Sequence, residues 1–245
     1  MPRVSTLDAL VRAVAEFPVA GLELSLDPAA LAVARRSLDE AGFLLLGEVH
    51  GVWQNPQVIR ELVRALELTS VALEWPNHLD SEVWAFLRDS GPPRDDPWLW
   101  AGDGRITAGH FAVLRDLIEV EPLTLTLFNV PIAAAGTWSD CDAGMVVHLL
   151  DSPAADSPTL VVAGNAHTPL TRTRLGIPLG ARLARHRPAV REIRIRYRSG
   201  RFYNFRSRRL SFRRRAAAPA RLTLEYDTPV VVIPSAHEAV VPHRR

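Results

Sequence analysis

Four short runs of apolar residues recur along the first two thirds of the chain, and polar or turn-forming residues follow each of them. Apolar runs of this length between turn signals are typical of buried strands. The four predicted strands span residues 43–50, 70–76, 123–131 and 159–167. Between them apolar residues return at helical spacing, and the predicted helices span residues 56–68, 80–90 and 107–119. This alternation predicts an α/β fold with a mostly parallel central sheet flanked by helices.

The last quarter of the chain follows a different pattern. Across residues 191–205, apolar and aromatic residues alternate with arginines, which is the period of a strand with one buried face. Ser199 and Gly200 suit a tight turn within this segment, so it is predicted to form an antiparallel, Arg-rich hairpin. The Arg- and Ala-rich residues 206–221 are predicted to be poorly ordered, and residues 230–234 to form one more strand.

Length and composition fit one folded domain. The chain has 245 residues, of which 47% are hydrophobic, and a chain of this size can bury a sizeable core. We expect a single α/β domain over residues 1–245, with N-terminal helices in residues 1–40, a motif-bearing core in residues 41–170 and the Arg-rich hairpin and tail in residues 171–245.

Cysteine content and hydropathy indicate a compartment. The single Cys excludes an internal disulfide framework. No apolar run reaches the roughly 18–20 residues of a membrane span. The N-terminal segment also lacks the uninterrupted apolar region of a secretory signal. We therefore expect a cytoplasmic protein that does not enter a membrane.

The charges are unevenly distributed, although the formal net charge is only +2. All basic side chains apart from His are Arg; residues 1–171 hold 10 Arg and 23 acids, and residues 172–245 hold 19 Arg and 4 acids. Residues 172–215, with 16 Arg and one acid, could contact the phosphates of a nucleic acid. We favour the alternative that this segment pairs with the acidic remainder of the chain or with a second subunit, and the oligomeric state stays open.

Ionisable residues stand at the ends of the predicted strands. Glu48 and His50 end the first, Glu74 ends the second, and His167 ends the fourth. The carboxyl ends of parallel strands meet at one edge of a sheet, where ligand sites form. We therefore expect these four side chains to fall within about 10 Å of each other.

Glycines accompany both histidines in a repeated Gly-x-x-His pattern. Gly47 and Gly51 are expected to permit the sharp turn out of the first strand. Gly164 ends the fourth strand, so His167 is expected to leave the sheet and to contribute little to the core.

Further candidates lie between these motifs and rank second. Arg105 and His110 could join the site, while Asp103 with Arg105 could equally be a solvent-exposed loop pair. Asp140 and Asp142 precede an apolar helical stretch and are interpreted first as helix caps, with a metal or substrate role as the lesser alternative.

The thiol and the tryptophans are interpreted mainly as structural. Cys141 has no evident activating partner in the sequence. Trp98 and Trp100 lie in the Pro- and Gly-rich segment 91–104, where they could form a lid over a substrate. The other tryptophans, Trp138 among them, are expected to pack in the core.

Three motifs together carry a family resemblance: LLLGEVHG (44–51), VALEWP (71–76) and VVAGNAH (161–167). In this order and strand context they resemble the superfamily that groups erythromycin esterases, ChaN-type haem-binding proteins and TIKI/TraB proteins. The resemblance covers roughly residues 40–170. The chain is much shorter than a typical erythromycin esterase, which argues against a bulky macrolide site, and it lacks the lipoprotein Cys of the ChaN type.

The resemblance implies a set of functional residues. The family's two Gly-x-x-His elements match His50 and His167, its Glu after the second strand matches Glu74, and its intervening Arg matches Arg105. Erythromycin esterases use His and Glu to hydrolyse a lactone, TIKI-type members resemble metal-dependent proteases, and ChaN-type members bind haem. The resemblance therefore implies a site without fixing its chemistry.

Two mechanisms are open to these residues. His50, Glu74 and His167 could hold a divalent metal ion that activates water. Alternatively, a carboxylate could orient His50 or His167 as a general base while Arg105 stabilises the developing oxyanion. Both would hydrolyse a carbonyl compound, an ester, a lactone or a peptide, and we favour hydrolysis of such a small-molecule or peptide substrate. The alternatives are a haem- or metal-binding protein without catalysis and a nucleic-acid-binding protein.

Overall fold

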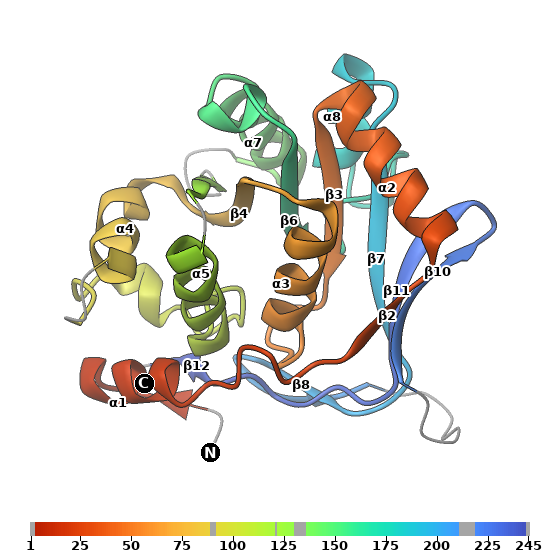
Figure 1. The fold of residues 1–245 in the computed structure, drawn as a ribbon. Helices are drawn as coiled ribbons and strands as arrows, with labels where there is room; N and C mark the ends of the chain where they lie inside the picture. Colours follow the sequence, from red (N-terminus) through yellow and green to blue (C-terminus); the bar gives the residue numbers. More distant parts are fainter. Residues whose placement is uncertain (1–2, 89–91, 121, 130–135, 211–218, 244–245) are drawn as a thin grey trace.

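The computed structural model describes residues 3–88, 92–120, 122–129, 136–210 and 219–243 (Figure 1). Its α-helices are α1 (Leu7–Ala15), α2 (Pro28–Ala41), α3 (Asn55–Leu66), α4 (Asp80–Arg88), α5 (Ala108–Val120), α7 (Trp138–Leu150) and α8 (Leu179–His186), and its short 3-10 helices are η1 (Asn77–Leu79), η2 (Pro97–Trp100) and η3 (Pro153–Ala155). Its strands are β1 (Arg3–Val4), β2 (Leu24–Leu26), β3 (Phe43–Glu48), β4 (Ser70–Pro76), β5 (Thr124–Asn129), β6 (Thr159–Gly164), β7 (Arg191–Tyr197), β8 (Arg201–Asn204), β9 (Arg206–Arg209), β10 (Ala220–Glu225), β11 (Thr228–Ile233) and β12 (Val241–Pro242).

A single large sheet organises these elements, in the strand order β2-β10-β11-β7-β3-β6-β4-β5. Its neighbouring strands run parallel except for the antiparallel pair β10 and β11. The predicted α/β fold with a mostly parallel sheet is therefore confirmed. In the register of β3 against β6, Glu48 lies opposite Gly164, which brings the two Gly-x-x-His elements side by side.

Helices cover both faces of the sheet because its central strands are apolar on both sides. On β3, Leu44 and Leu46 join a core with α1 to α5, whereas Phe43 and Leu45 join a second core with α7 and α8. Successive side chains of a strand point to opposite faces, so these cores lie on opposite sides of the sheet. Figure 1 shows α2, α3 and α5 in front of the strands. Within the described residues, no helix is long and apolar enough to cross a membrane.

The Arg-rich hairpin exists, but its predicted turn is wrong. Residues 191–197 form β7, which pairs in parallel with β3 and β11 inside the large sheet. The antiparallel hairpin consists of β8 and β9, and its chain reversal lies at Phe205. Gly200 instead leads the chain past residue 236, where a Cβ would collide with the backbone of Ala236. Strand β9 also corrects the expectation of disorder for its part of 206–221; residues 211–218 lie outside the described residues.

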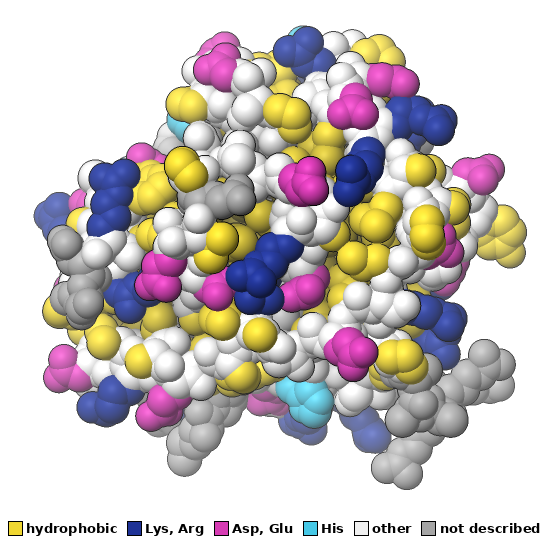
Figure 2. Space-filling model, viewed as in Figure 1, with side chains coloured by type: hydrophobic (Ala, Val, Ile, Leu, Met, Phe, Trp, Pro, Cys, Tyr) yellow, Lys and Arg dark blue, Asp and Glu magenta, His cyan; other side chains and the backbone are white. Residues whose placement is uncertain are grey.

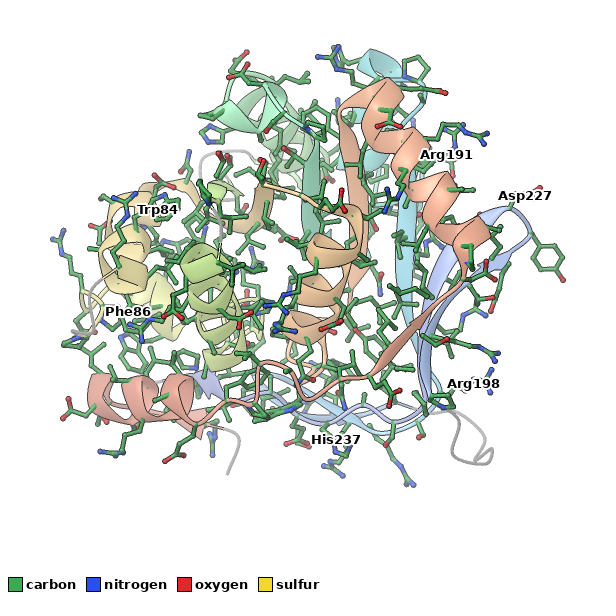
Figure 3. All side chains as sticks on the ribbon, viewed as in Figure 1. Trp84, Phe86, Arg191, Arg198, Asp227 and His237 are labelled. Carbon is green, nitrogen blue, oxygen red and sulfur yellow. The ribbon has the colours of Figure 1, made fainter. Side chains whose placement is uncertain are left out.

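The arginines of β7 alternate with buried residues as predicted. Ile193, Ile195 and Tyr197 are buried, while Arg194 and Arg196 are exposed. Figure 3 shows Arg191 and Arg198 at the two ends of this strand and Asp227 at the turn between β10 and β11. The predicted strand over 230–234 corresponds to β11.

The ion pairs of the basic portion of the chain, residues 172–245, join residues within that portion. Among the described residues, the acids that pair with its arginines are Glu192, Glu225 and Glu238, at 2.9, 2.5 and 2.9 Å. All three belong to residues 172–245, so these contacts do not join the basic portion to the acidic one. Figure 2 shows basic and acidic side chains interspersed on the face in view. Pairing with a second subunit stays a prediction.

Removing residues 172–245 should abolish cooperative folding. The deletion takes β7, β10 and β11 out of the sheet and leaves β3 as an unpaired edge over an opened core. Thermal unfolding followed by circular dichroism should show no cooperative transition in the truncated chain. A truncated protein with an unchanged Tm would mean that this portion is an appendage, which the strand order contradicts.

Candidate functional site

The carboxylate of Glu74 lies at the centre of a cluster at the carboxyl ends of β3, β4 and β6. The Nε2 atoms of His50 and His167 lie 3.7 and 3.6 Å from its two oxygens. Glu48 lines the same cleft as His50 and Glu74. The geometry expected for these four side chains is therefore present, because three parallel strands end at the same edge of the sheet.

Glu74 is buried and shares both oxygens with cationic or donor groups. Oε1 lies 3.1 Å from Nη1 of Arg105, and Oε2 accepts a 2.7 Å hydrogen bond from the backbone N–H of Gly164. Burial alone would raise the pKa of Glu74, but the charges of His167 and Arg105 and the contact with His50 outweigh it and hold this pKa well below its usual range. Glu74 is therefore a carboxylate at neutral pH.

The same contacts act on the two histidines in the opposite direction. Burial lowers the pKa of His50, but the nearby carboxylate of Glu74, 3.7 Å from Nε2, outweighs burial and raises this pKa above its usual value. Burial likewise lowers the pKa of His167, and the charge of Glu74 and the hydrogen bond with Asp142 raise it overall. Both imidazoles therefore gain a proton more readily than a free histidine does.

His167 is held by two residues of α7 that the sequence interpretation placed elsewhere. Its Nδ1 is 2.7 Å from Oδ1 of Asp142, and its ring stacks on Trp138 with 5.2 Å between centroids. Asp142 also accepts a 2.9 Å hydrogen bond from the N–H of Leu179, so it caps α8 and not its own helix, which Thr137 caps. Trp138 is half-exposed and not part of the core.

One feature of the sequence could have identified Asp142 as a partner of another site residue. It lies on the buried face of α7 with Cys141, Met145 and Leu149, and a carboxylate on such a face needs a partner. Trp138 precedes it by one helical turn, which places both side chains on the same side of the helix.

His167 is also more buried than its position after a strand led us to expect, with 4% of its surface exposed. We therefore correct the expectation that it contributes little to the core. Replacing His167 with alanine should lower the free energy of unfolding by about 1–3 kcal/mol, because Asp142 loses a buried partner. Chemical denaturation measures this, and an unchanged midpoint would show that the Asp142 contact contributes nothing to stability.

Arg105 joins the site through a loop before α5. Its Nε lies 2.6 Å from Oδ2 of Asp103, and its carbonyl accepts a 2.9 Å hydrogen bond from Nε1 of Trp75. Only 14% of the Asp103 side chain and 16% of the Arg105 side chain are exposed, so the alternative of a solvent-exposed pair is wrong. Asp103 fixes the guanidinium so that it faces Glu74.

Two further ionisable residues face each other in the same cleft. Nε2 of His110, in the first turn of α5, lies 3.9 Å from Oε2 of Glu48. Both side chains are buried, and His110 packs edge-on against Trp75. His110 is therefore part of the site and not a surface residue of a helix terminus.

The first glycine of each Gly-x-x-His element allows a neighbouring side chain to approach the backbone closely. A Cβ on Gly47, inside β3, would lie 2.5 Å from Oγ1 of Thr168, and one on Gly164 would lie 2.9 Å from Nε2 of His50. The expectation that Gly47 permits the turn is therefore wrong. Gly51 fits that expectation, with φ at +75°.

The remaining candidates lie outside the cleft. Cys141 is buried, and burial with the charges of Asp142 and Glu74 raises the pKa of its thiol to about 11, which suits a structural role. Trp100 donates a hydrogen bond to Asp95, and Trp98 packs near His78, so the residues expected to form a lid contact other parts of the chain. Trp75 lines the cleft instead.

The donors around Glu74 do not fit a divalent metal ion. Within the described part of the chain, no three His, Cys, Asp or Glu side chains are arranged to hold one. The guanidinium of Arg105 already occupies the cation position at Oε1 of Glu74, and the N–H of Gly164 occupies Oε2. A metal at this carboxylate would have to bind beside the positive charge of Arg105, which opposes it.

Comparison with solved structures finds proteins of the same fold. The chain has the α/β fold found in an erythromycin esterase, a variant of EreC solved in its open conformation, with a TM-score of 0.60, 10% identity, and coverage of 85% of this chain and 94% of that one. A succinoglycan biosynthesis protein matches with a TM-score of 0.59 at 8% identity over 96% and 98% of the two chains. A Bacillus cereus protein matches at 0.53 and 9% identity over 98% and 100%.

These likenesses confirm the expected resemblance at the level of the fold. No protein-family model and no curated protein sequence matches the chain. At 8–10% identity the shared property is the arrangement of strands and helices. Activity has to be argued from the side chains of the cleft.

Proposed function

We propose that this protein is a hydrolase of small carbonyl compounds, an ester or lactone first and a peptide second, and that it works without a metal ion. The observation that carries the proposal is the shared contact of Glu74 with His50 and Arg105. These two side chains are 14% and 16% exposed, whereas Glu74 is 4% exposed. A substrate in the cleft would therefore meet a base and a cation that one buried carboxylate holds in place.

The reaction begins with water and the imidazole of His50. His50 removes a proton from the water while the water oxygen bonds to the carbonyl carbon. The charge of Glu74 stabilises the imidazolium as it forms, since it already raises the pKa of His50. Arg105 faces the oxyanion that develops on the carbonyl oxygen and stabilises it.

His167 and Asp142 support this arrangement from behind the carboxylate. His167 lies 3.6 Å from Oε1 of Glu74 and is anchored to Asp142 at 2.7 Å. Neither side chain is exposed enough to meet a substrate directly. We assign both a positioning role.

The dimensions of the cleft favour a small substrate. Its volume is about 10 Å³, about the space of one water molecule and far below the roughly 300–1,000 Å³ of sites that enclose drug-sized ligands. A macrolide or a haem exceeds this volume. The erythromycin esterase of similar fold supports ester-bond chemistry, and the size of the cleft points to a smaller substrate than erythromycin.

A panel of p-nitrophenyl esters, simple lactones and short peptides tests the proposal. We expect turnover of a short-chain ester or lactone, with the same rate before and after dialysis against a chelator. Absence of turnover across the panel would contradict the hydrolase. Loss of turnover on chelation, restored by a divalent ion, would contradict the metal-free mechanism.

A further inference from the structure

The hairpin formed by β8 and β9 carries positive charge that the acids around it do not balance. Over residues 193–224 the sequence contains 11 Arg and no Asp or Glu. Arg201 of β8 forms an ion pair of 2.9 Å with Glu238. The other arginines of residues 198–210 have no acidic partner among the described residues: Arg198, Arg206, Arg208 and Arg209. The three that belong to β9 are exposed, so their charges face solvent.

The register of the two strands adds to the repulsion between these charges. Arg209 of β9 lies directly opposite Arg201 of β8. Like charges in directly opposite positions destabilise a pair of strands. A ligand with a row of negative charges would relieve this repulsion where it contacts both strands. The hairpin is therefore suited to bind a polyanion.

An exposed aromatic ring stands among these arginines, at the chain reversal of the hairpin. The N–H of Phe205 donates a 2.7 Å hydrogen bond to the carbonyl of Gly102, and its carbonyl accepts a 3.0 Å hydrogen bond from the hydroxyl of Tyr203. These contacts hold the backbone, while 58% of the surface of Phe205 is exposed. Its φ of +54° is a left-handed conformation that Asn or Gly adopts at a lower cost. Neither the core nor the turn requires an aromatic residue here.

The attachment of β8 favours a flexible ligand over a rigid duplex. The N–H groups of Arg201 and Tyr203 donate 3.0 Å hydrogen bonds to the carbonyls of Ala236 and Gly51, so the outer edge of β8 is bound to the body of the protein. Figure 1 shows β8 below α3, close to the rest of the chain. A two-stranded ribbon reads a duplex by entering its groove, which a ribbon bound along one edge cannot do. A single strand can instead follow the exposed side of β9.

We propose that the β8–β9 hairpin binds single-stranded nucleic acid, with Arg206, Arg208 and Arg209 on its phosphates and Phe205 stacked on a base. Proteins that bind single strands without sequence preference combine a basic surface along the backbone with aromatic side chains that stack on bases. An acidic lipid surface would match the arginines but not the single ring, because binding to a membrane surface scales with the apolar area that enters it. The proposal does not depend on the hydrolase activity.

Fluorescence anisotropy of labelled oligothymidylate and oligouridylate of about 12 nucleotides measures this binding, since known sites take about 4–16 nucleotides. The test variant combines Arg206→Gln, Arg208→Gln and Arg209→Gln. Each phosphate contact with a single strand contributes about −0.7 to the slope of log K against log salt. Loss of three contacts should therefore make the slope shallower by about 2 and weaken binding at about 50 mM salt by about 10²-fold.

A matched variant removes the same charge from other surfaces. It combines Arg12→Gln, Arg36→Gln and Arg185→Gln, at exposed positions on α1, α2 and α8. Binding of the oligonucleotides and its salt slope should stay close to those of the wild-type protein. Equal losses in the two triple variants would mean that binding follows net charge alone, and would overturn the assignment to the hairpin.

Phe205→Asn tests the stacking and keeps a residue that suits the left-handed turn. Loss of one stacked base should weaken binding by about 5–100-fold. The salt slope should not change, because no charge is removed. An unchanged affinity would show that the bases are not contacted, and would overturn the assignment to a nucleic acid in favour of a polyanion without bases.

Comparison of ligands on the wild-type protein needs no folded variant. The single strands should bind more tightly than a duplex of the same length, and more tightly than vesicles of phosphatidylcholine and phosphatidylserine. Tighter binding of the duplex or of the vesicles would overturn the proposal. Absence of binding to both oligonucleotides at about 50 mM salt, where phosphate contacts are strong, would also overturn it and would leave the proposed hydrolase unaffected.

Discussion

Replacing His50 with glutamine should lower ester hydrolysis by about 10²–10⁴-fold, the usual contribution of a general base. Glutamine keeps a polar side chain near Glu74 but cannot take a proton from water. Because the His50 side chain is more exposed than the carboxylate that it contacts, at 14% against 4%, its loss should change the rate far more than the fold. The measurement is kcat/KM on the best ester of the panel, together with Tm.

The matched control is His237→Gln. His237, labelled in Figure 3, is exposed and is not among the residues that line the cleft, so this variant should keep the wild-type rate. A His50→Gln protein that retains full activity with an unchanged Tm would rule out His50 as the base. The same rate loss in both variants would show that the assay reports general damage.

Replacing Glu74 with glutamine should lower both activity and stability. Arg105, His50 and His167 all face this carboxylate, and removal of one partner from a buried ionic cluster typically costs about 3–5 kcal/mol. Because Arg105 keeps its ion pair with Asp103, we expect a loss of stability near the lower end of this range. Loss of the charge that stabilises the imidazolium and holds Arg105 should reduce kcat by about 10²–10³-fold.

Glu40→Gln provides the control for this substitution, because Glu40 is exposed on α2. It should leave Tm and rate close to those of the wild-type protein. If Glu74→Gln unfolded at the wild-type temperature, the contacts of Glu74 with Arg105, His50 and His167 would contribute nothing to stability. If it also kept its rate, Glu74 would not organise the site.

The central part of the site follows from the sequence because it depends on local rules. The apolar runs of β3, β4 and β6 predict buried parallel strands, and parallel strands end at one edge. Glu48, His50, Glu74 and His167 stand at those ends, and they converge because β3, β6 and β4 are adjacent in the sheet, an order that the sequence does not specify. Arg105 and His110 were named because they lie between the motifs, and Arg105 also because it matches the Arg of the family that the chain resembles; the loop and helix that hold them complete the cleft.

The remaining features depend on packing between distant segments. Asp142 reaches His167 only because α7 lies against the end of β6, and no local pattern specifies that contact. The place of β7 between β3 and β11 is likewise a matter of topology, since the alternating pattern of 191–197 fits an edge hairpin as well as a central strand. Gly47 was predicted to permit a turn, but a glycine can also allow a neighbouring group to approach the backbone closely. The approach of Thr168 shows that Gly47 has this second role, and it is a tertiary contact that no local pattern specifies.

The pH dependence of kcat/KM in the wild-type protein and in Glu74→Gln tests the central claim most directly. A general base works only when neutral, so the rate should rise with pH through the pKa of His50, and Glu74 sets that pKa above the usual value of 6.5. Glu74→Gln removes the charge that favours the imidazolium while burial still disfavours it, so the rise should move to lower pH. The account predicts a midpoint above 6.5 in the wild-type protein and a lower one in the variant; the same midpoint in both would contradict it.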